Sequence, residues 1–228
     1  MSTILEMKNI NKIYGTTVKT QVLYDINLNF NQGSFNSIIG QSGSGKSTLM
    51  NIMGTLDSPT SGEIIVAGKS TSGMKASELA RYRNQSIGFV FQFHYLLPEF
   101  TALENVLMPY RIGHKTIPKE TMDRAKELMA LVGLEKVMNN NATQMSGGQQ
   151  QRTAIARALL NQPKMILADE PTGNLDSLST ETIYDLLRDI NERFGTTFII
   201  ITHDRRIAEK ADRIIEIADG RISLDVTR

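Results

Sequence analysis

The pattern of apolar and polar residues predicts two kinds of strand in this 228-residue chain. Apolar and polar positions alternate in Ile4–Ile10 and Val22–Phe30, which predicts an antiparallel pair with one covered face. Ser37–Ile39, Met165–Ala168 and Phe198–Thr202 are instead continuous apolar runs. Such runs are typical of parallel strands that are covered on both faces.

Helical spacing appears between these strands. Lys46–Met53 continues the first apolar run as a helix, and a second helix is expected from near Ser146 to about Asn161, before Pro163. Between Thr101 and Leu160 apolar residues recur at helical spacing, among them Met122, Ala125, Leu128, Met129 and Val132. The sequence therefore predicts an α/β fold in which a mostly helical insertion interrupts a parallel-sheet domain.

Composition narrows the class of protein. Lys and Arg number 25 against 24 Asp and Glu, so the charge balance gives no reason to expect binding to nucleic acid. The absence of cysteine rules out disulfides and thiolate metal sites and fits a cytoplasmic protein. No window approaches the roughly 18 apolar residues of a membrane-spanning helix, and no signal peptide is visible. We expect a soluble intracellular chain whose membrane role, if any, comes through partners.

A glycine-rich loop follows the first apolar run. Gly40-Gln-Ser-Gly-Ser-Gly-Lys-Ser47 fits the phosphate-binding pattern G-x-x-x-x-G-K-[ST] between a predicted strand and a predicted helix. The glycines let backbone N–H groups close around phosphate oxygens, and the helix N-terminus adds positive potential. Lys46 is expected to reach the β- and γ-phosphates, and the Ser47 hydroxyl to ligate Mg²⁺. The expected phosphate-binding residues are Gly40, Ser42, Gly43, Ser44, Gly45, Lys46, Ser47 and Thr48.

Two adjacent carboxylates follow the run Met165–Ala168. Ligands of α/β sheets gather at the carboxyl ends of the strands, so Asp169 and Glu170 are candidates for chemistry. Asp169 would hold Mg²⁺ through water, and Glu170 would polarise the attacking water as general base. A strand-end Asp-Glu pair alone is usually just solvated, and only the neighbouring glycine-rich loop favours the catalytic interpretation.

Two further polar residues are candidates for the same site. His203 ends the run that follows the strand of Asp169, and its imidazole could contact the γ-phosphate and orient the water. A lone strand-end histidine is usually structural, but this position favours a function. Gln92, between Phe91 and Phe93, has an amide that could ligate Mg²⁺ or position water, although spacing alone favours a surface glutamine.

A second glycine pair stands at the start of the helix near Ser146. Ser146-Gly147-Gly148-Gln149 fits a capping box, S-x-x-Q, which is its structural interpretation. Capping does not require two glycines at the first helical positions, where they destabilise the helix. Bare backbone amides at a helix N-terminus form an anion site, so the glycines favour close approach to a second phosphate.

Together these motifs resemble those of the ATP-binding cassette (ABC) ATPases, over essentially the whole chain and in the right order. The resemblance identifies Gly40–Ser47 as Walker A, Gln92 as Q-loop, Met145–Gln149 as signature, Met165–Glu170 as Walker B, Asn174–Asp176 as D-loop and His203 as H-loop. Met145 replaces the leucine that usually opens the signature.

The resemblance implies one ABC nucleotide-binding domain over residues 1–228. A RecA-like P-loop NTPase core with an N-terminal antiparallel β-subdomain would comprise 1–92 and 161–228, and an inserted helical subdomain 93–160. The family implies that Tyr14 stacks on adenine, that Glu170, His203 and Gln92 serve catalysis, and that Asp176 belongs to the D-loop. It also implies a dimer around MgATP, in which Ser146, Gly147, Gly148 and Gln149 touch ATP bound by a second copy.

A narrower resemblance is to the subgroup of lipoprotein-release ATPases (LolD), MacB-type exporters and FtsE. Pro171–Asp176, Thr17–Leu23 and, for LolD, Phe91–Val106 carry it, whereas Gln149–Arg152 fits MacB-type proteins equally. Five aromatics fall within Phe89–Phe100, and an exposed apolar patch there would suit a partner's short helix. In the family this region receives integral membrane permease subunits, which implies a peripheral position on the cytoplasmic face of the inner membrane.

Several alternatives stay open from the sequence. Within transport they are antimicrobial peptide or macrolide export and division-linked cell-wall control. A soluble ABC ATPase of iron–sulfur assembly would lack a use for the aromatic stretch. A P-loop small-molecule kinase would leave Ser146–Gln149 and His203 without a role. The cargo cannot be named, because membrane subunits would select it.

Overall fold

The computed structural model describes residues 2–228 and contains two β-sheets. An antiparallel four-stranded sheet has the order β2 (Thr20–Asn31), β1 (Thr3–Tyr14), β4 (Ser61–Val66) and β5 (Lys69–Ser70). A six-stranded sheet has the order β10 (Arg221–Thr227), β9 (Arg213–Ala218), β3 (Phe35–Ile39), β8 (Thr197–Ile201), β7 (Met165–Asp169) and β6 (Ile87–Phe91). In the second sheet all neighbours are parallel except the edge strand β10.

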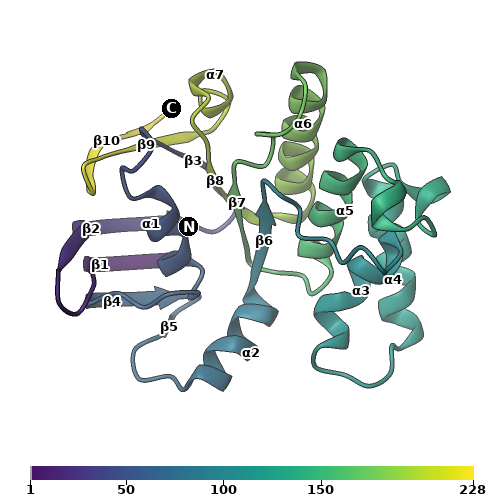
Figure 1. Ribbon diagram of the computed structural model, residues 1–228, viewed down its shortest axis with the longest axis horizontal. Helices are drawn as coiled ribbons and strands as arrows, with labels where there is room; N and C mark the ends of the chain where they lie inside the picture. The colour runs from purple at the N-terminus through teal and green to yellow at the C-terminus, as the bar shows by residue number, and fades with distance from the viewer. Residues whose placement is uncertain (1) are drawn as a thin grey trace.

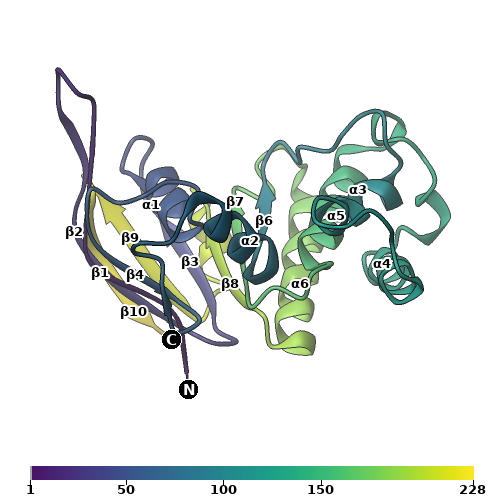
Figure 2. The same cartoon turned by 90° about the horizontal axis from the view of Figure 1, so that it is seen from below.

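Helices lie between and beside the sheets. Figure 2 shows α1 (Lys46–Met53) between the two sheets, with α6 (Ser177–Phe194), α5 (Gly147–Leu159) and α4 (Lys119–Leu131) on the far side of the larger sheet. Near them in Figure 1 lie α3 (Ala102–Arg111) and two short 3-10 turns, Glu135–Val137 and Ala142–Gln144. The remaining helices are α2 (Ala76–Ser86), which leads into β6, and the short α7 (Arg205–Ala208).

Two apolar cores match this layering. One lies between the sheets and joins Leu5 and Phe30 of the small sheet with Leu49 of α1. The other covers the opposite face of the larger sheet and joins Phe198 with side chains of α3, α4, α5 and α6, such as Ile155. Both faces of the parallel strands are therefore covered, which is why their sequences are continuous apolar runs.

The α/β architecture expected from the sequence is confirmed, with a parallel sheet, an N-terminal antiparallel sheet and a helical region. The alternating segments Ile4–Ile10 and Val22–Phe30 lie in the antiparallel pair β1 and β2. Helix α1 has the predicted bounds, while α5 ends at Leu159, two residues before the expected Asn161. The division into subdomains at 92/93 and 160/161 stays a prediction, because the helices share a continuous core with the sheet.

Four loops leave the six-stranded sheet at the carboxyl ends of its parallel strands. Strands β3, β6, β7 and β8 are parallel, so their carboxyl ends meet on the same side. The segments that leave these ends begin at Gly40, Gln92, Glu170 and Thr202. No helix within residues 2–228 is long and apolar enough to cross a membrane.

Candidate active site

The glycine-rich loop makes a tight turn between β3 and α1. Gly43 and Gly45 have φ of 79° and 104°, in the left-handed region that favours glycine. A Cβ on Gly45 would lie 2.9 Å from Leu23 Cδ2 and 3.2 Å from Val22 O, so a side chain would also collide with β2. Gly45 directly precedes α1, whose first backbone N–H groups consequently face the loop without a side-chain cap.

Lys46 folds over this loop. Its Nζ donates to Gly40 O at 2.8 Å and to Gln41 O at 2.7 Å. The loop borders a cavity of about 470 Å³, and the cavity's lining unites the phosphate-loop residues with the candidate catalytic residues. The lining consists of Val22, Ser42, Gly43, Gly45, Lys46, Ser47, Thr48, Gln92, Asp169, Glu170 and His203.

Gly40 and Ser44 belong to the glycine-rich loop, but neither residue lines the cavity. A Cβ on Gly40 would lie 2.3 Å from Ile217 O, so only glycine fits beside β9. Ser44 is buried, and its backbone N donates to Gln41 O at 3.2 Å.

Asp169 and Glu170 differ in environment although they are adjacent. Asp169 ends β7, and burial, followed by repulsion from Glu170, raises the pKa of its carboxyl, while Lys46 partly opposes the shift. Glu170 has φ of 45°, a strained value for a side-chain-bearing residue, and its N donates to Ile201 O at 2.9 Å. Its Oε1 lies 2.8 Å from His203 Nδ1, so the ends of β7 and β8 present an acid–imidazole pair to the cavity.

Gln92 is held by the segment that follows Glu170. Its Nε2 donates to Asn174 Oδ1 at 3.1 Å, and Asn174 Nδ2 donates to Gln92 O at 3.1 Å. A Cβ on Gly173 would lie 2.7 Å from Gln92 Nε2, so the glycine makes room for this approach. Gln92 is therefore tied to the loop between β7 and α6, and it lines the cavity with Asp169 and Ser47.

Tyr14 lies beside the cavity rather than in its lining. Its hydroxyl donates to Asp57 Oδ2 at 2.7 Å, and Lys12 Nζ lies 4.6 Å from the ring centroid. Burial and the bond to Asp57 raise the pKa of Tyr14, with an opposing bond to Thr48, which does line the cavity. Burial alone would raise the pKa of Asp57, but hydrogen bonds from Lys12 and Tyr14 outweigh it and lower the pKa.

The second glycine pair lies in a different place. Ser146 caps α5 as the sequence predicts, since its Oγ accepts from Gln149 N at 3.3 Å and Gln149 Oε1 accepts from Ser146 N at 2.9 Å. Ser146, Gly148 and Gln149 line a separate hollow of about 300 Å³, which shares no lining residue with the cavity of Lys46. Gly147 is exposed at the same helix end. One chain therefore does not bring the two glycine motifs together.

Asp176 has a structural role in this chain. It is the residue before α6, and its Oδ1 and Oδ2 accept from Ser179 N at 2.9 Å and from Ser179 Oγ at 2.8 Å. These hydrogen bonds lower the pKa of its carboxyl. The carboxylate thus serves as a helix cap at the surface near the hollow of Ser146, whose lining includes Ser179.

The aromatic stretch Phe89–Phe100 divides into covered and exposed side chains. Phe89 and Phe91 stack with ring centroids 5.7 Å apart and pack against the core between the sheets. Phe93 and Tyr95 are exposed to 66% and 63%. Partly exposed Leu97 adds to this surface. Two large aromatic side chains therefore remain available to a partner.

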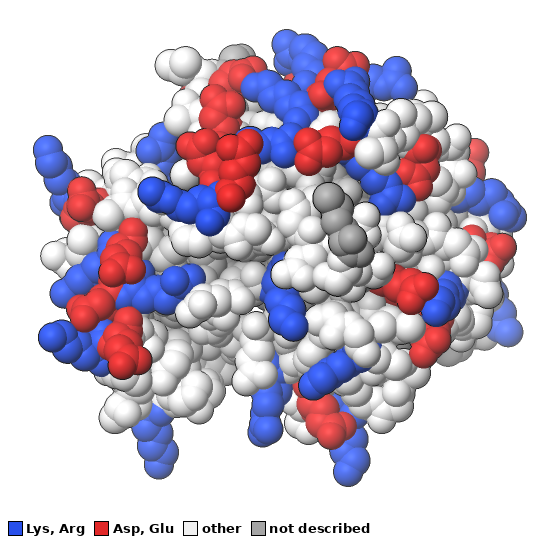
Figure 3. Space-filling model, turned by 180° about the vertical axis from the view of Figure 1, so that it is seen from behind, with Lys and Arg blue, Asp and Glu red and all other residues white. Residues whose placement is uncertain are grey.

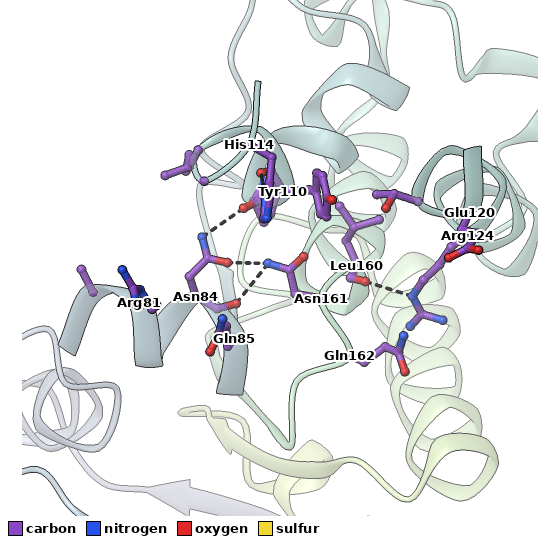
Figure 4. A pocket seen from close by; sticks show the side chains of 15 residues that line it. Arg81, Asn84, Gln85, Tyr110, His114, Glu120, Arg124, Leu160, Asn161 and Gln162 are labelled. Atoms are coloured by element: carbon purple, nitrogen blue, oxygen red, sulfur yellow. Dashed lines mark hydrogen bonds between the residues drawn. The ribbon is translucent and has the colours of Figure 1, made fainter. Parts of the chain in front are cut away.

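A larger hollow, of about 840 Å³, lies between α2 and the helical region. Figure 4 shows Asn84 of α2 and Asn161, beyond α5, hydrogen-bonded across its floor. Asn84 Nδ2 also donates to Pro109 O at 3.0 Å. Tyr110 and the exposed Ile112, at the end of α3, line the same hollow. This surface combines apolar side chains with fixed amide groups.

Some residues of the cavity were not predicted from the sequence. Val22 lines it from β2, and Asn174 holds Gln92, although the sequence placed Asn174 only within a D-loop pattern. Neither a valine in an alternating strand nor a single asparagine after Gly173 carries a signal of its own. The parallel-strand argument predicted the meeting of Asp169, Glu170 and His203, which the structure brings to one cavity.

Comparison with known proteins agrees with this geometry. A sequence model of the ABC transporter family matches residues 23–173. The chain is 48% identical to the lipoprotein-releasing system ATP-binding protein LolD 1 of Rhodopseudomonas palustris, covering 98% of this chain and 100% of that protein. It is 46% identical to the LolD protein of Shewanella denitrificans, covering 98% and 96%.

Solved structures show the same fold. The ATP-binding cassette MJ0796, in a dimeric post-hydrolysis state bound to ADP and Pi, superimposes with a TM-score of 0.89 at 42% identity, covering 98% of each chain. The cassette cbiO1 of Clostridium perfringens gives a TM-score of 0.89 at 28% identity, covering 100% of this chain and 89% of that one. With its phosphate loop, strand-end carboxylates and separate signature helix, the chain therefore belongs to the ABC transporter family, as one of its ATP-hydrolysing cassettes.

Proposed function

We propose that this chain is the ATPase subunit of a transporter that releases lipoproteins from the inner membrane. The observation that carries the proposal is the identity of 46–48% to three LolD proteins of lipoprotein-releasing systems, over at least 97% of this chain. A MacB-type exporter and an FtsE-like division complex are the alternatives that experiment must separate.

In the reaction, the candidate residues in and beside the cavity have separate roles. Lys46 and the amides of the loop bind the phosphates of ATP, because cations and helix N-termini stabilise anions. Glu170 accepts a proton from the attacking water, and His203, 2.8 Å from it, orients Glu170 and contacts the γ-phosphate. Tyr14 supplies an aromatic face for adenine. Gln92, which lines the same cavity, positions the water.

The cavity also suits Mg²⁺. Ser47, Gln92 and Asp169 offer a hydroxyl, an amide and a carboxylate oxygen, which are the hard ligands that Mg²⁺ prefers, and all three line one cavity. Bound there, Mg²⁺ would neutralise charge on the phosphates of ATP. Within the chain itself, Lys46 opposes the raised pKa of Asp169 and so favours the ionised carboxylate that such a ligand requires.

The working unit is a dimer of two copies. Ser146 and Gly148 line a hollow that shares no residue with the cavity of Lys46, so within one chain the signature and the phosphate loop face different hollows. A second copy in head-to-tail orientation would place its Ser146 and glycine amides on ATP held by Lys46. The dimeric state of the relative MJ0796 supports this arrangement.

Integral membrane subunits dock on the chain from the cytoplasmic face of the membrane. Exposed Phe93 and Tyr95, together with the hollow of about 840 Å³ that Tyr110 and Ile112 line, support such a docking surface. The chain would thus be a peripheral membrane protein.

Figure 3 shows basic and acidic side chains interspersed over the rear face. On this face they do not form the continuous basic surface that is typical of nucleic-acid binding.

Depletion of the protein in its native cell, with fractionation of the membranes, tests the proposal. Loss of the chain should leave lipoproteins in the inner membrane, and a Lys46→Ala copy should fail to correct this. The membrane protein that co-purifies with a Glu170→Gln copy should be an integral subunit of the same system. Normal lipoprotein sorting combined with macrolide sensitivity or a division defect would instead support the MacB-type or FtsE-like alternative.

A further inference from the structure

The loop after Gln92 contains two consecutive residues in a backbone conformation that L-amino acids rarely adopt. His94 and Tyr95 have φ of 59° and 48°. In this left-handed region Cβ crowds the following carbonyl, so such residues persist only where their surroundings hold them. The backbone N of His94 donates to Phe91 O at 3.2 Å, and the backbone N of Tyr95 donates to Phe93 O at 2.6 Å. Two short turns alone do not account for this shape.

Arg157 of α5, a residue outside the loop, binds the loop backbone through its guanidinium group. Its Nη1 donates to Tyr95 O at 2.6 Å and its Nη2 donates to His94 O at 2.5 Å. One planar guanidinium therefore bridges the carbonyls of both left-handed residues, and a fixed fork of donors loses little freedom in doing so. The contact joins positions 62 and 63 residues apart in the sequence.

The surroundings of Arg157 match this role. Burial lowers the pKa of its guanidinium. Within residues 2–228 no carboxylate forms a salt bridge with it. Arg157 is partly buried, and desolvation of a cation is unfavourable unless hydrogen bonds compensate it, so the two loop carbonyls also stabilise Arg157.

A second contact joins the same helix to the same loop. The side chain of Gln150 faces the His94 ring, which is only 9% exposed. Gln150 Nε2 donates to the carbonyls of Ala142 and Met145, both at 3.1 Å, and Met145 directly precedes Ser146. Gln150 and Arg157 are seven residues apart on α5 and therefore lie on one face of the helix.

We propose that Arg157 is a positioning residue for ATP hydrolysis. By bridging the carbonyls of His94 and Tyr95, it holds the loop in the shape that places Gln92 at the nucleotide cavity. The same contact fixes this loop to the helix that begins at Ser146, so the two motifs keep one relative orientation. The inference rests on the proposed function of Gln92 in the cavity.

A double-mutant cycle tests this directly. Glycine adopts left-handed backbone without a Cβ penalty, so a loop carrying His94→Gly and Tyr95→Gly keeps its shape without the clamp. In the native loop, Arg157→Met should lower the kcat for ATP about tenfold while KM changes less than about twofold. In the glycine loop, the same substitution should lower kcat less than about threefold.

A matched control uses another arginine that donates to two backbone carbonyls. Arg124 of α4 donates to Leu160 O at 2.9 Å and to Leu159 O at 3.1 Å, and neither residue is left-handed. Any loss from Arg124→Met should be the same in the native and glycine loops. An equal loss from Arg157→Met in both loops would overturn the proposal, because Arg157 would then act by packing alone.

Hydrogen exchange separates this inference from the proposed function. In Arg157→Met the amides of residues 92–97 should exchange about tenfold faster, while those of β7 keep their rate. Unchanged exchange in the loop would overturn the clamp whether or not the chain hydrolyses ATP. If Arg157→Met does not fold, Arg157→Lys serves for both measurements, because one ammonium cannot reproduce the planar fork. Failure of wild-type hydrolysis would count against the proposed function alone.

Discussion

Oε1 of Glu170 lies 2.8 Å from Nδ1 of His203, although the two residues leave different strands of the sheet. Strands β7 and β8 are parallel neighbours, so their carboxyl ends bring the pair together beside the phosphate loop. Glu170 holds this position with φ of 45°, an unfavourable value for a side-chain-bearing residue. Backbone strain of this kind gathers at functional sites, where the surrounding structure supports it.

Replacing Glu170 with glutamine separates binding from turnover. The amide keeps the size of the side chain but cannot accept the proton of the attacking water. General-base groups contribute roughly 10²–10⁴-fold, so kcat should fall by at least about a hundredfold. ATP affinity, measured by equilibrium binding, should stay within about threefold of wild type. Wild-type hydrolysis in this variant would exclude Glu170 as the general base.

Asp169→Asn should stabilise the protein while inactivating it. The pKa of Asp169 is raised in the fold by burial and by Glu170. A raised acid pKa favours the folded state below the unfolded pKa, and this stability is lost as pH rises through the folded pKa. At pH 7 the ionised carboxylate therefore opposes folding, and the asparagine variant should have the higher Tm.

The same linkage fixes how this difference depends on pH. As pH falls below the unfolded Asp pKa of about 3.9, the carboxyl becomes neutral in the folded and the unfolded wild type, and the two Tm values should converge. ATP turnover of the variant should be low at every pH, because a Mg²⁺ ligand is lost. A lower Tm for the variant at pH 7, or a difference that grows on acidification, would contradict the electrostatic account of Asp169.

Gly173→Ala should displace Gln92 without unfolding the chain. The new Cβ would lie 2.7 Å from Gln92 Nε2, the end of a flexible side chain, and Gly173 does not have a positive φ. The amide must therefore leave its position beside Asn174. We expect kcat to fall about tenfold at an unchanged Tm, since binding geometry near the reacting atoms changes. Asn174→Ala, which removes the Gln92 contact without steric pressure, should lower kcat less.

Tyr14 and Asp57 should matter for the base of the nucleotide and not for its phosphates. Tyr14→Ala removes an aromatic stack worth about 1 kcal/mol or more, so ATP affinity should weaken roughly five- to tenfold. Asp57→Asn, which weakens the 2.7 Å hydrogen bond to the Tyr14 hydroxyl, should have a smaller effect in the same direction. Inorganic tripolyphosphate, used as competitor, should bind all three proteins equally. Weaker tripolyphosphate binding would show instead that the phosphate loop itself is disturbed.

Much of the fold could be predicted because its signals are local. The continuous run at Met165 and the alternation in Ile4–Ile10 follow directly from which faces are covered. The helices α2 and α6 and the strands β9 and β10 were not predicted. In Arg221–Thr227, for example, most side chains are exposed, so the edge strand β10 has little hydrophobic pattern to identify it.

The sequence predicted only those site residues that carry a local motif or that follow the ends of parallel strands. Glycines and Lys46 carry a motif of their own, and parallel strands bring Glu170 to His203. By contrast, Gln92 and Asn174 meet across 82 residues, and the pairing depends on side-chain amides with no sequence signature. Arg157 likewise contacts backbone carbonyls, which any residue provides, so neither contact could be predicted from the sequence.

A mixing experiment tests the composite site most directly. Lys46→Ala disables the phosphate loop, and Ser146→Arg blocks the signature, so each homodimer alone should be nearly inactive. Half of randomly mixed dimers would be heterodimers with one intact composite site, so an equimolar mixture should recover about a quarter of wild-type ATP hydrolysis. Activity that equals only the sum of the two inactive parents would contradict the claim that Ser146 acts on ATP bound by a second copy.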